Sequence, residues 1–205
     1  RHGVLSFESM SNIKQSFREY LDKNYVLNTL ELEKKSISKN DKSIKILFKT
    51  YDGYFIETVS MVDNDRHTVC ISSQVGCALD CDFCATGKLG LKRNLITGEI
   101  VDQLIFVRNE IKTPITNVVF MGMGEPFHNY KNVLAAADIF HSHKGFNLAS
   151  TRITISTVGL LPQINQFIKE KRKYKLAISL NASNDKTRTE IMPINKKWGI
   201  QEIVK

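Results

Sequence analysis

Short apolar segments alternate with amphipathic segments from residue 68 onward, and this alternation restricts the fold more than any other feature of the chain. Helical spacing of apolar residues predicts helices over 99–111, 130–140 and 161–170. Strands that alternate with helices indicate parallel β/α units with helices covering the sheet. We therefore predict an α/β fold whose strands are "TVCIS" (68–72), "ITNVVFM" (115–121), "TRITIST" (151–157) and "KLAISL" (175–180).

The N-terminal part of the chain lacks this alternation. Apolar residues at helical spacing predict a helix over 9–23, with Ser9 or Ser11 as its N-cap. The mixed polar stretch 34–42 predicts a loop. These features indicate a small accessory region ahead of the β/α units.

A β-hairpin is predicted between this loop and the β/α units. The segments 44–50 and 54–60 flank Tyr51-Asp52-Gly53, and an Asp-Gly pair suits a tight turn. We therefore divide the chain into an accessory helix and hairpin over 1–66 and a β/α region over 67–205.

All four cysteines of the chain lie between residues 70 and 84. Cys77, Cys81 and Cys84 have three and then two residues between them, so three thiolates on one short loop can converge on one metal centre. No signal peptide or membrane-spanning apolar run is visible, so we expect a cytoplasmic protein. Disulfides are not expected there, because cytoplasmic thiols are kept reduced.

Two kinds of metal centre fit three cysteines on one loop. A structural zinc site needs four ligands, and His67 or Cys70 is the candidate for the fourth. An iron–sulfur cubane held by three thiolates leaves one iron open to an outside molecule. The spacing favours the iron–sulfur centre.

Polar or glycine-rich residues follow each predicted parallel strand. In β/α folds ligands bind at the carboxyl ends of the strands, which meet at one edge of the sheet. We therefore expect one shared pocket, built from the segments 72–90, 121–126, 156–159 and 179–183.

The residues around the cysteines carry a resemblance to a known family. These residues are "VCISSQVGCALDCDFCATGKLGLKRNL", and further segments that match are "FESMSNIKQSFREYL", "IETV", "FMGMGEP", "ITISTVGLLPQI" and "SLNASNDKTRTEIMPIN". With them the chain closely resembles the radical S-adenosylmethionine enzymes that methylate adenine in ribosomal RNA, the RlmN type and its Cfr relatives. The resemblance covers nearly the whole chain and implies a partial open (β/α) barrel of the radical SAM type.

The resemblance implies two cofactors, a [4Fe-4S] cluster and S-adenosylmethionine. Cys77, Cys81 and Cys84 match the three cluster ligands, which leave one iron for the amino and carboxylate groups of S-adenosylmethionine. An electron from the cluster then yields a 5'-deoxyadenosyl radical. The positions that match S-adenosylmethionine contacts are Gly124, Glu125, Ser156, Ser179, Leu180 and Asn181.

Two further residues match catalytic positions of the family. Cys70 matches a cysteine outside the cluster that resolves a covalent protein–RNA intermediate, and its alternative role is that of a small buried hydrophobe. Glu57 matches a glutamate proposed as a proton acceptor, and its alternative role is that of an exposed hairpin residue.

The chain departs from the family pattern in two places. Asn181 stands where the family has histidine, and an amide cannot titrate as imidazole does. The family also methylates one of its own cysteines near the C-terminus, whereas no cysteine follows Cys84 here. We therefore expect a fragment that covers the accessory region and the first part of a six-unit barrel.

The family resemblance implies methylation of adenine C2 in 23S rRNA and of the adenine beside the anticodon in tRNA. Pro126 favours the RlmN type over a Cfr-like C8 enzyme, and a non-catalytic metal-binding RNA module is the other alternative. The net charge of +8 suits a polyanionic partner but also suits solvated faces. We also expect an external electron donor, no membrane and a monomer.

Overall fold

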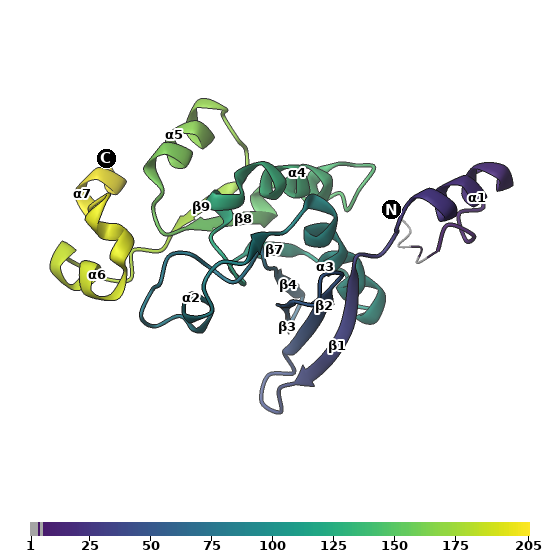
Figure 1. The fold of residues 1–205 in the computed structure, drawn as a ribbon, viewed down its shortest axis with the longest axis horizontal. Helices are drawn as coiled ribbons and strands as arrows, with labels where there is room; N and C mark the ends of the chain where they lie inside the picture. The colour runs from purple at the N-terminus through teal and green to yellow at the C-terminus, as the bar shows by residue number, and fades with distance from the viewer. Residues whose placement is uncertain (1–3, 5) are drawn as a thin grey trace.

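One seven-stranded sheet runs through the computed structural model, which describes residue 4 and residues 6–205 (Figure 1). The strands follow the order β1-β2-β3-β4-β7-β8-β9, so β1 and β9 form its two edges and the sheet does not close. The strands are β1 (Leu30–Ile37), β2 (Ile44–Thr50), β3 (Phe55–Asp63), β4 (Arg66–Cys70), β7 (Asn117–Phe120), β8 (Ile153–Thr157) and β9 (Lys175–Ile178).

The sheet joins two kinds of strand pairing at β4. Strands β1 to β4 are antiparallel, with Val59 of β3 opposite Cys70 of β4. Strands β4, β7, β8 and β9 are parallel. The predicted α/β fold with a partial open barrel is therefore confirmed, and the sheet continues across the boundary predicted at residue 66.

Helices cover one face of this sheet. Figure 1 shows α4 (Tyr130–His141) and α5 (Leu161–Lys169) above β8 and β9. Helix α3 (Thr97–Glu110) packs on the hairpin strands, where the rings of Phe48 and Phe106 meet edge to face at 5.0 Å. No helix in the described part of the chain is long and apolar enough to cross a bilayer.

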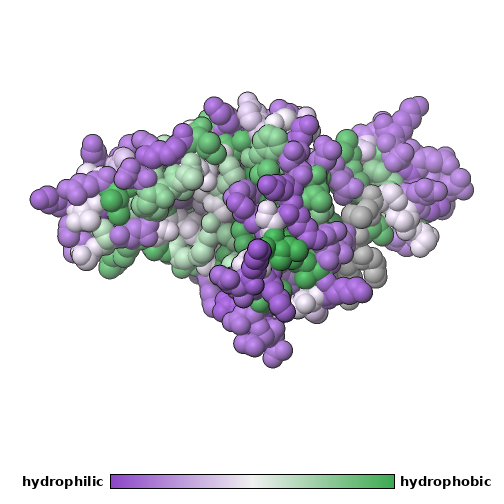
Figure 2. Space-filling view, turned by 90° about the horizontal axis from the view of Figure 1, so that it is seen from below, coloured by the Kyte–Doolittle hydropathy of each residue, from purple (hydrophilic) through white to green (hydrophobic). Residues whose placement is uncertain are grey.

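The opposite face of the sheet is only half-buried. Side chains alternate between the two faces of a strand, so Val69, Val118 and Ile155 point into the helix-covered core and are fully buried. Their neighbours Cys70 and Ser156 point to the other face and are half-buried. Seen from below in Figure 2, hydrophobic and weakly polar side chains gather left of the centre of the molecule, and hydrophilic side chains gather toward its right end.

The N-terminal elements differ from their predicted bounds. Helix α1 spans Gln15–Asn24, so the predicted start at residue 9 is wrong. Ser9 donates through Oγ to the carbonyl of Ser6 at 2.8 Å, and such a local bond competes with helix formation. The hairpin is confirmed as β2 and β3.

The predicted loop at 34–42 is also wrong over its first residues. Residues 34–37 belong to β1, an edge strand in which every residue after Leu30 is exposed. Edge strands tolerate lysine and show no apolar alternation, which is why the pattern is that of a loop.

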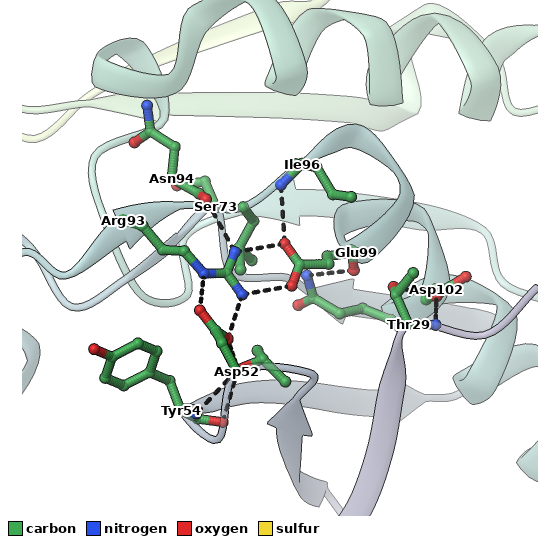
Figure 3. A network of polar contacts seen from close by, with 12 residues as sticks. Thr29, Asp52, Tyr54, Ser73, Arg93, Asn94, Ile96, Glu99 and Asp102 are labelled. Carbon is green, nitrogen blue, oxygen red and sulfur yellow. Dashed lines mark hydrogen bonds and ion pairs between the residues drawn. The ribbon is translucent and has the colours of Figure 1, made fainter. Parts of the chain in front are cut away.

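A polar network ties the hairpin turn to the first turn of α3 (Figure 3). Arg93 donates to both carboxylate oxygens of Asp52, at 2.6 and 2.8 Å, and to both of Glu99, at 2.8 Å. The Glu99 side chain is fully buried and also accepts from the backbone N–H of Ile96 at 3.0 Å. Because Arg93 donates to Asp52, the pKa of that carboxyl lies below its usual range.

Substituting Arg93 tests this network. In Arg93→Ala the Glu99 carboxylate keeps only its bond from Ile96, so we expect the free energy of unfolding to fall by about 3 kcal/mol. The control Lys35→Ala removes an exposed ion pair with Glu110 and should cost at most about 1 kcal/mol. Urea unfolding followed by circular dichroism measures both, and equal losses would contradict a special role for Arg93.

Candidate functional site

Cys77, Cys81 and Cys84 lie on a loop that leaves the sheet after β4 and is closed at its neck by a short ladder. Strands β5 (Gln74–Val75) and β6 (Arg93–Asn94) pair there. Gly76 has φ +75°, and a Cβ at this position would lie 1.8 Å from the carbonyl oxygen of Gly90. Only glycine therefore allows the two sides of the neck to approach so closely.

Two buried amides fasten this neck to the rest of the molecule. Asn129 donates through Nδ2 to the carbonyls of Ser73 and Leu95, at 2.8 and 2.7 Å. Gln74 donates to Asn94 Oδ1 at 2.7 Å, and its Oε1 accepts from the backbone N–H of Glu125 at 2.8 Å. Gln74 therefore links the cysteine loop directly to the "GMGEP" segment.

The structure brings the three predicted metal ligands together. Cys77 and Cys81 are 9% and 7% exposed and form one buried cluster with Leu79 and Met192, against which the half-buried Cys84 packs. Burial, with the nearby acidic groups, raises the pKa of the Cys77 thiol and raises that of Cys81 to about 11. A cation at this site must therefore displace thiol protons when it binds.

These residues fit an iron–sulfur cubane. In the described residues no three His, Cys, Asp or Glu side chains are grouped to hold a single ion. A cubane spreads its thiolates over different irons, and thiolates are the ligands of iron–sulfur clusters. Cys77, Cys81 and Cys84 would hold three corners, with no fourth cysteine in their cluster.

His67 cannot complete a zinc site with these cysteines. Its side chain is fully buried and points to the helix-covered face, opposite to Cys70. Its Nε2 lies 2.8 Å from Ser60 Oγ, and its Nδ1 lies 2.9 Å from the carbonyl oxygen of Thr113. Both ring nitrogens are engaged, so the proposed role of His67 as fourth ligand is wrong.

Glu125 lies at the end of β7, between the cysteine loop and the end of β8. Its side chain is 2% exposed and accepts from the backbone N–H groups of Phe127 and Val158, at 2.9 and 3.0 Å. Burial raises the pKa of this carboxyl. Each carboxylate oxygen retains a lone pair for a further donor, such as an ammonium group. The preceding Gly124 has φ +98°, and a Cβ at this position would lie 2.5 Å from the Cβ of Gln74.

The other predicted cofactor contacts follow the next two strands. Ser156 lies on β8, half-buried on the open face opposite Ala177 of β9. Ser179 extends the ladder by donating its N–H to the carbonyl of Thr157 at 2.9 Å, and Leu180 follows it. Asn181 has φ +57°, and its Nδ2 lies 3.6 Å from Met192 Sδ, which places it beside the cysteine cluster.

The two predicted catalytic residues lie on the same open face. Cys70 stands opposite Val59, and burial raises the pKa of its thiol. Glu57 lies two residues along β3 from Val59, so it shares that face. Its carbonyl accepts from Ser72 Oγ, while its carboxylate is 42% exposed and pairs with Lys45 at 2.9 Å.

Four residues of the site were not among the predictions. Gln74 and Asn129 fasten the neck, and Met192 packs on the cysteines. Arg188 of α6 (Asp185–Ile191) is fully buried and donates to the carbonyls of Val158 and Leu180 and to Asn195 Oδ1. A single arginine between two threonines gives no periodic signal in the sequence, so only its contacts identify it.

Comparison with known proteins decides the family. The family model described as the radical SAM superfamily matches residues 71–205. The chain belongs to the radical SAM superfamily. Radical SAM proteins carry a [4Fe-4S] cluster and use S-adenosylmethionine, so the two predicted cofactors are confirmed.

Relatives within the radical SAM superfamily agree in name. A probable dual-specificity RNA methyltransferase RlmN from Cytophaga hutchinsonii is 47% identical over 200 residues, 96% of this chain and 54% of the relative. A dual-specificity RNA methyltransferase RlmN from Pelobacter propionicus is 42% identical over all of this chain and 58% of its own length. The chain therefore spans little more than half of the curated relatives it matches.

A solved radical SAM structure has the same fold. The crystal structure of a radical SAM methyltransferase from Sphaerobacter thermophilus superimposes with a TM-score of 0.92 at 41% identity. The match covers 98% of this chain and 60% of that protein. The predicted resemblance to the RlmN type of radical SAM protein is confirmed.

Substituting single cysteines separates ligands from the other thiol. We expect anaerobic iron–sulfur reconstitution to give a brown protein, and Cys81→Ala to lose the visible absorbance and most of the iron, because one of three ligands is gone. Cys70→Ala is the matched control and should retain both. Iron and zinc analysis of each variant measures the outcome, and stoichiometric zinc in a colourless wild-type protein would contradict the assignment.

Glycine at the neck of the loop is a second test of the site. Gly76→Ala puts a methyl group against the Gly90 carbonyl at positive φ, so we expect a loss of at least about 2 kcal/mol in unfolding free energy, with reduced iron loading. Gly98→Ala is the control, because nothing lies within 4 Å of its Cβ and alanine favours helix α3 by about 0.5–1 kcal/mol. Urea unfolding and iron content report on both, and equal behaviour would refute the close approach.

Proposed function

We propose that this chain is the N-terminal and central part of an RNA methyltransferase. The enzyme methylates C2 of a specific adenine in 23S rRNA and of the adenine beside the anticodon in tRNA. The observation that carries the proposal is the buried cluster of Cys77, Cys81 and Cys84 at the carboxyl edge of the sheet, beside Glu125. The names of relatives at 42–47% identity support the choice of RNA as substrate.

Two groups of residues carry out different parts of the proposed reaction. One group lies at the carboxyl ends of the strands and binds the cofactors, and the other lies on the open face of the sheet. Cys77, Cys81 and Cys84 hold the cluster, which, with S-adenosylmethionine bound, supplies a 5'-deoxyadenosyl radical. The buried position of Cys77 and Cys81 helps to keep water from that centre. The cofactor itself is held by Gly124, Glu125, Ser156, Ser179, Leu180 and Asn181, at the ends of β7, β8 and β9.

The open face of the sheet receives the target base. Cys70 is a half-buried thiol there, and it is the residue that resolves the covalent intermediate between the protein and the RNA. Glu57 is the proton acceptor, and its pair with Lys45 is exposed enough to open at little cost. The base must leave its stack to reach this face, which costs a few kcal/mol.

The proposed reaction also needs a cysteine that accepts the methyl group, and no cysteine follows Cys84 in this chain. The excess of basic residues, +8 overall, favours a polyanionic substrate through released counterions. We place the enzyme in the cytoplasm, where rRNA and tRNA are available.

Mass spectrometry of modified adenosine tests the reaction. We expect expression of the full-length protein in cells that lack this activity to produce 2-methyladenosine in 23S rRNA and tRNA, and Cys81→Ala to abolish it. The Lys35→Ala protein is the control for expression. Formation of 8-methyladenosine would favour the Cfr-like alternative, and no modification by a cluster-loaded protein would favour a non-catalytic metal-binding module.

A further inference from the structure

A groove borders the cysteine loop on the side away from the open face. It is lined by residues 78–79, His128, Leu160, residues 193–194 and residues 196–198, and has a volume of about 470 Å³. We call it the lysine groove. We propose that the lysine groove is the docking site of an acidic electron-transfer protein, with a flavin or iron–sulfur group, that reduces the cluster. The inference rests on the proposed function.

The lysine groove is separated from the cluster ligands by a single layer of side chains. Residues 78–79 stand between Cys77 and Cys81 in the chain. Leu79 and Ile194 line the groove and also pack in the cysteine cluster. Because these sulfur atoms are shielded from solvent, a donor must approach over a thin part of the protein, and this groove provides one.

Charge on the groove suits an acidic partner. Lys196 and Lys197 are exposed on its wall, and no Asp or Glu is among its described lining residues. Burial and the charge of Lys197 lower the pKa of His128. The exposed carboxylates of Asp80 and Asp82 on the same loop are paired with Lys88. The two lysines on the groove wall therefore attract an acidic protein.

The floor of the groove has the composition of a protein interface. Its centre is apolar, with Leu79, Leu160, Pro193 and Ile194, and Trp198 lies beside the lysines. An apolar centre with an aromatic anchor and a charged rim is typical of protein partners, and interfaces of electron-transfer pairs are small, below about 1,200 Å². RNA instead needs access to Cys70 and Ser156 on the open face.

Hydrogen bonds join the segments that line the groove. The backbone N–H of Asp82 donates to the carbonyl of Ile191 at 2.9 Å, which joins the cysteine loop to the end of α6. Arg188 donates to the carbonyl of Trp198 at 3.5 Å and to Asn195 at 2.6 Å. A preformed surface lowers the ordering cost of a transient complex.

The electron-transfer step is balanced by the two partners alone. The reduced flavin or iron–sulfur group of the donor loses one electron and is thereby oxidised. The cluster held by Cys77, Cys81 and Cys84 gains that electron, and no bond forms or breaks.

Stopped-flow reduction of the cluster tests the docking site in the reconstituted full-length protein. The reductants are a flavodoxin hydroquinone and a reduced ferredoxin, with dithionite as the small-molecule control. We expect Lys196→Glu/Lys197→Glu to lower the second-order rate constant of at least one protein reductant by about tenfold or more at low salt. We expect Trp198→Ala to slow the same reaction, and dithionite reduction to change by no more than about twofold.

A matched variant and an RNA arm distinguish the alternatives. Lys169→Glu/Lys173→Glu makes the same charge change at the exposed end of α5 and should leave the rates within about twofold of wild type. Equal rates for the groove variant and wild type would overturn the proposal, as would a cluster that dithionite reduces and neither protein does. Weaker binding of a 23S rRNA stem-loop with unchanged rates would make the groove an RNA surface instead.

These outcomes are separable from failure of the proposed function. Loss of methyladenosine with normal cluster reduction contradicts the reaction and leaves the docking site standing. A protein that assembles no cluster contradicts both.

Discussion

The closed neck of the cysteine loop is the constraint on which the rest of the site depends. Where the chain leaves β4 it is buried, and buried peptide groups must be hydrogen-bonded. The side chain of Gln103 in α3 hydrogen-bonds two of them: it accepts from the N–H of Ser72 at 2.8 Å and donates to the carbonyl of Ser72 at 3.0 Å. The side chain of Asn129 donates to the carbonyls of Ser73 and Leu95, which lie on the two sides of the neck. The loop can therefore present its thiols from a fixed base.

Buried and partly exposed charges in this molecule join segments that are distant in sequence. Glu125 joins the end of β7 to Val158, and Arg188 joins α6 to the same residue. Arg93 joins the neck to Asp52 in the hairpin turn. An unpaired buried charge costs several kcal/mol, so each tie holds its segments in one arrangement. The accessory hairpin is in this way part of the site, because its turn helps to hold the cysteine loop.

The sheet places three groups of residues on different surfaces. Its helix-covered face forms the core, its open face carries Cys70 and Glu57, and its carboxyl edge carries the cysteines and Glu125. The lysine groove lies beyond that edge. The surface proposed for the nucleic acid and the groove proposed for the redox protein are therefore separate, so the proposal allows both partners to bind at the same time.

Local pattern in the sequence was sufficient for the parallel strands, for α3 to α5 and for the grouping of Cys77, Cys81 and Cys84. Those features arise from neighbours a few residues apart, whose spacing sets which side chains share a face or a loop. Pattern failed for β1, because an exposed edge strand has no buried side to mark. It also failed for Gln74 and Arg188, whose partners lie 51 and 30 residues away. Such contacts exist only once the sheet has brought distant segments together, and so the tertiary structure alone decided what fastens the cysteine loop and which surface borders it.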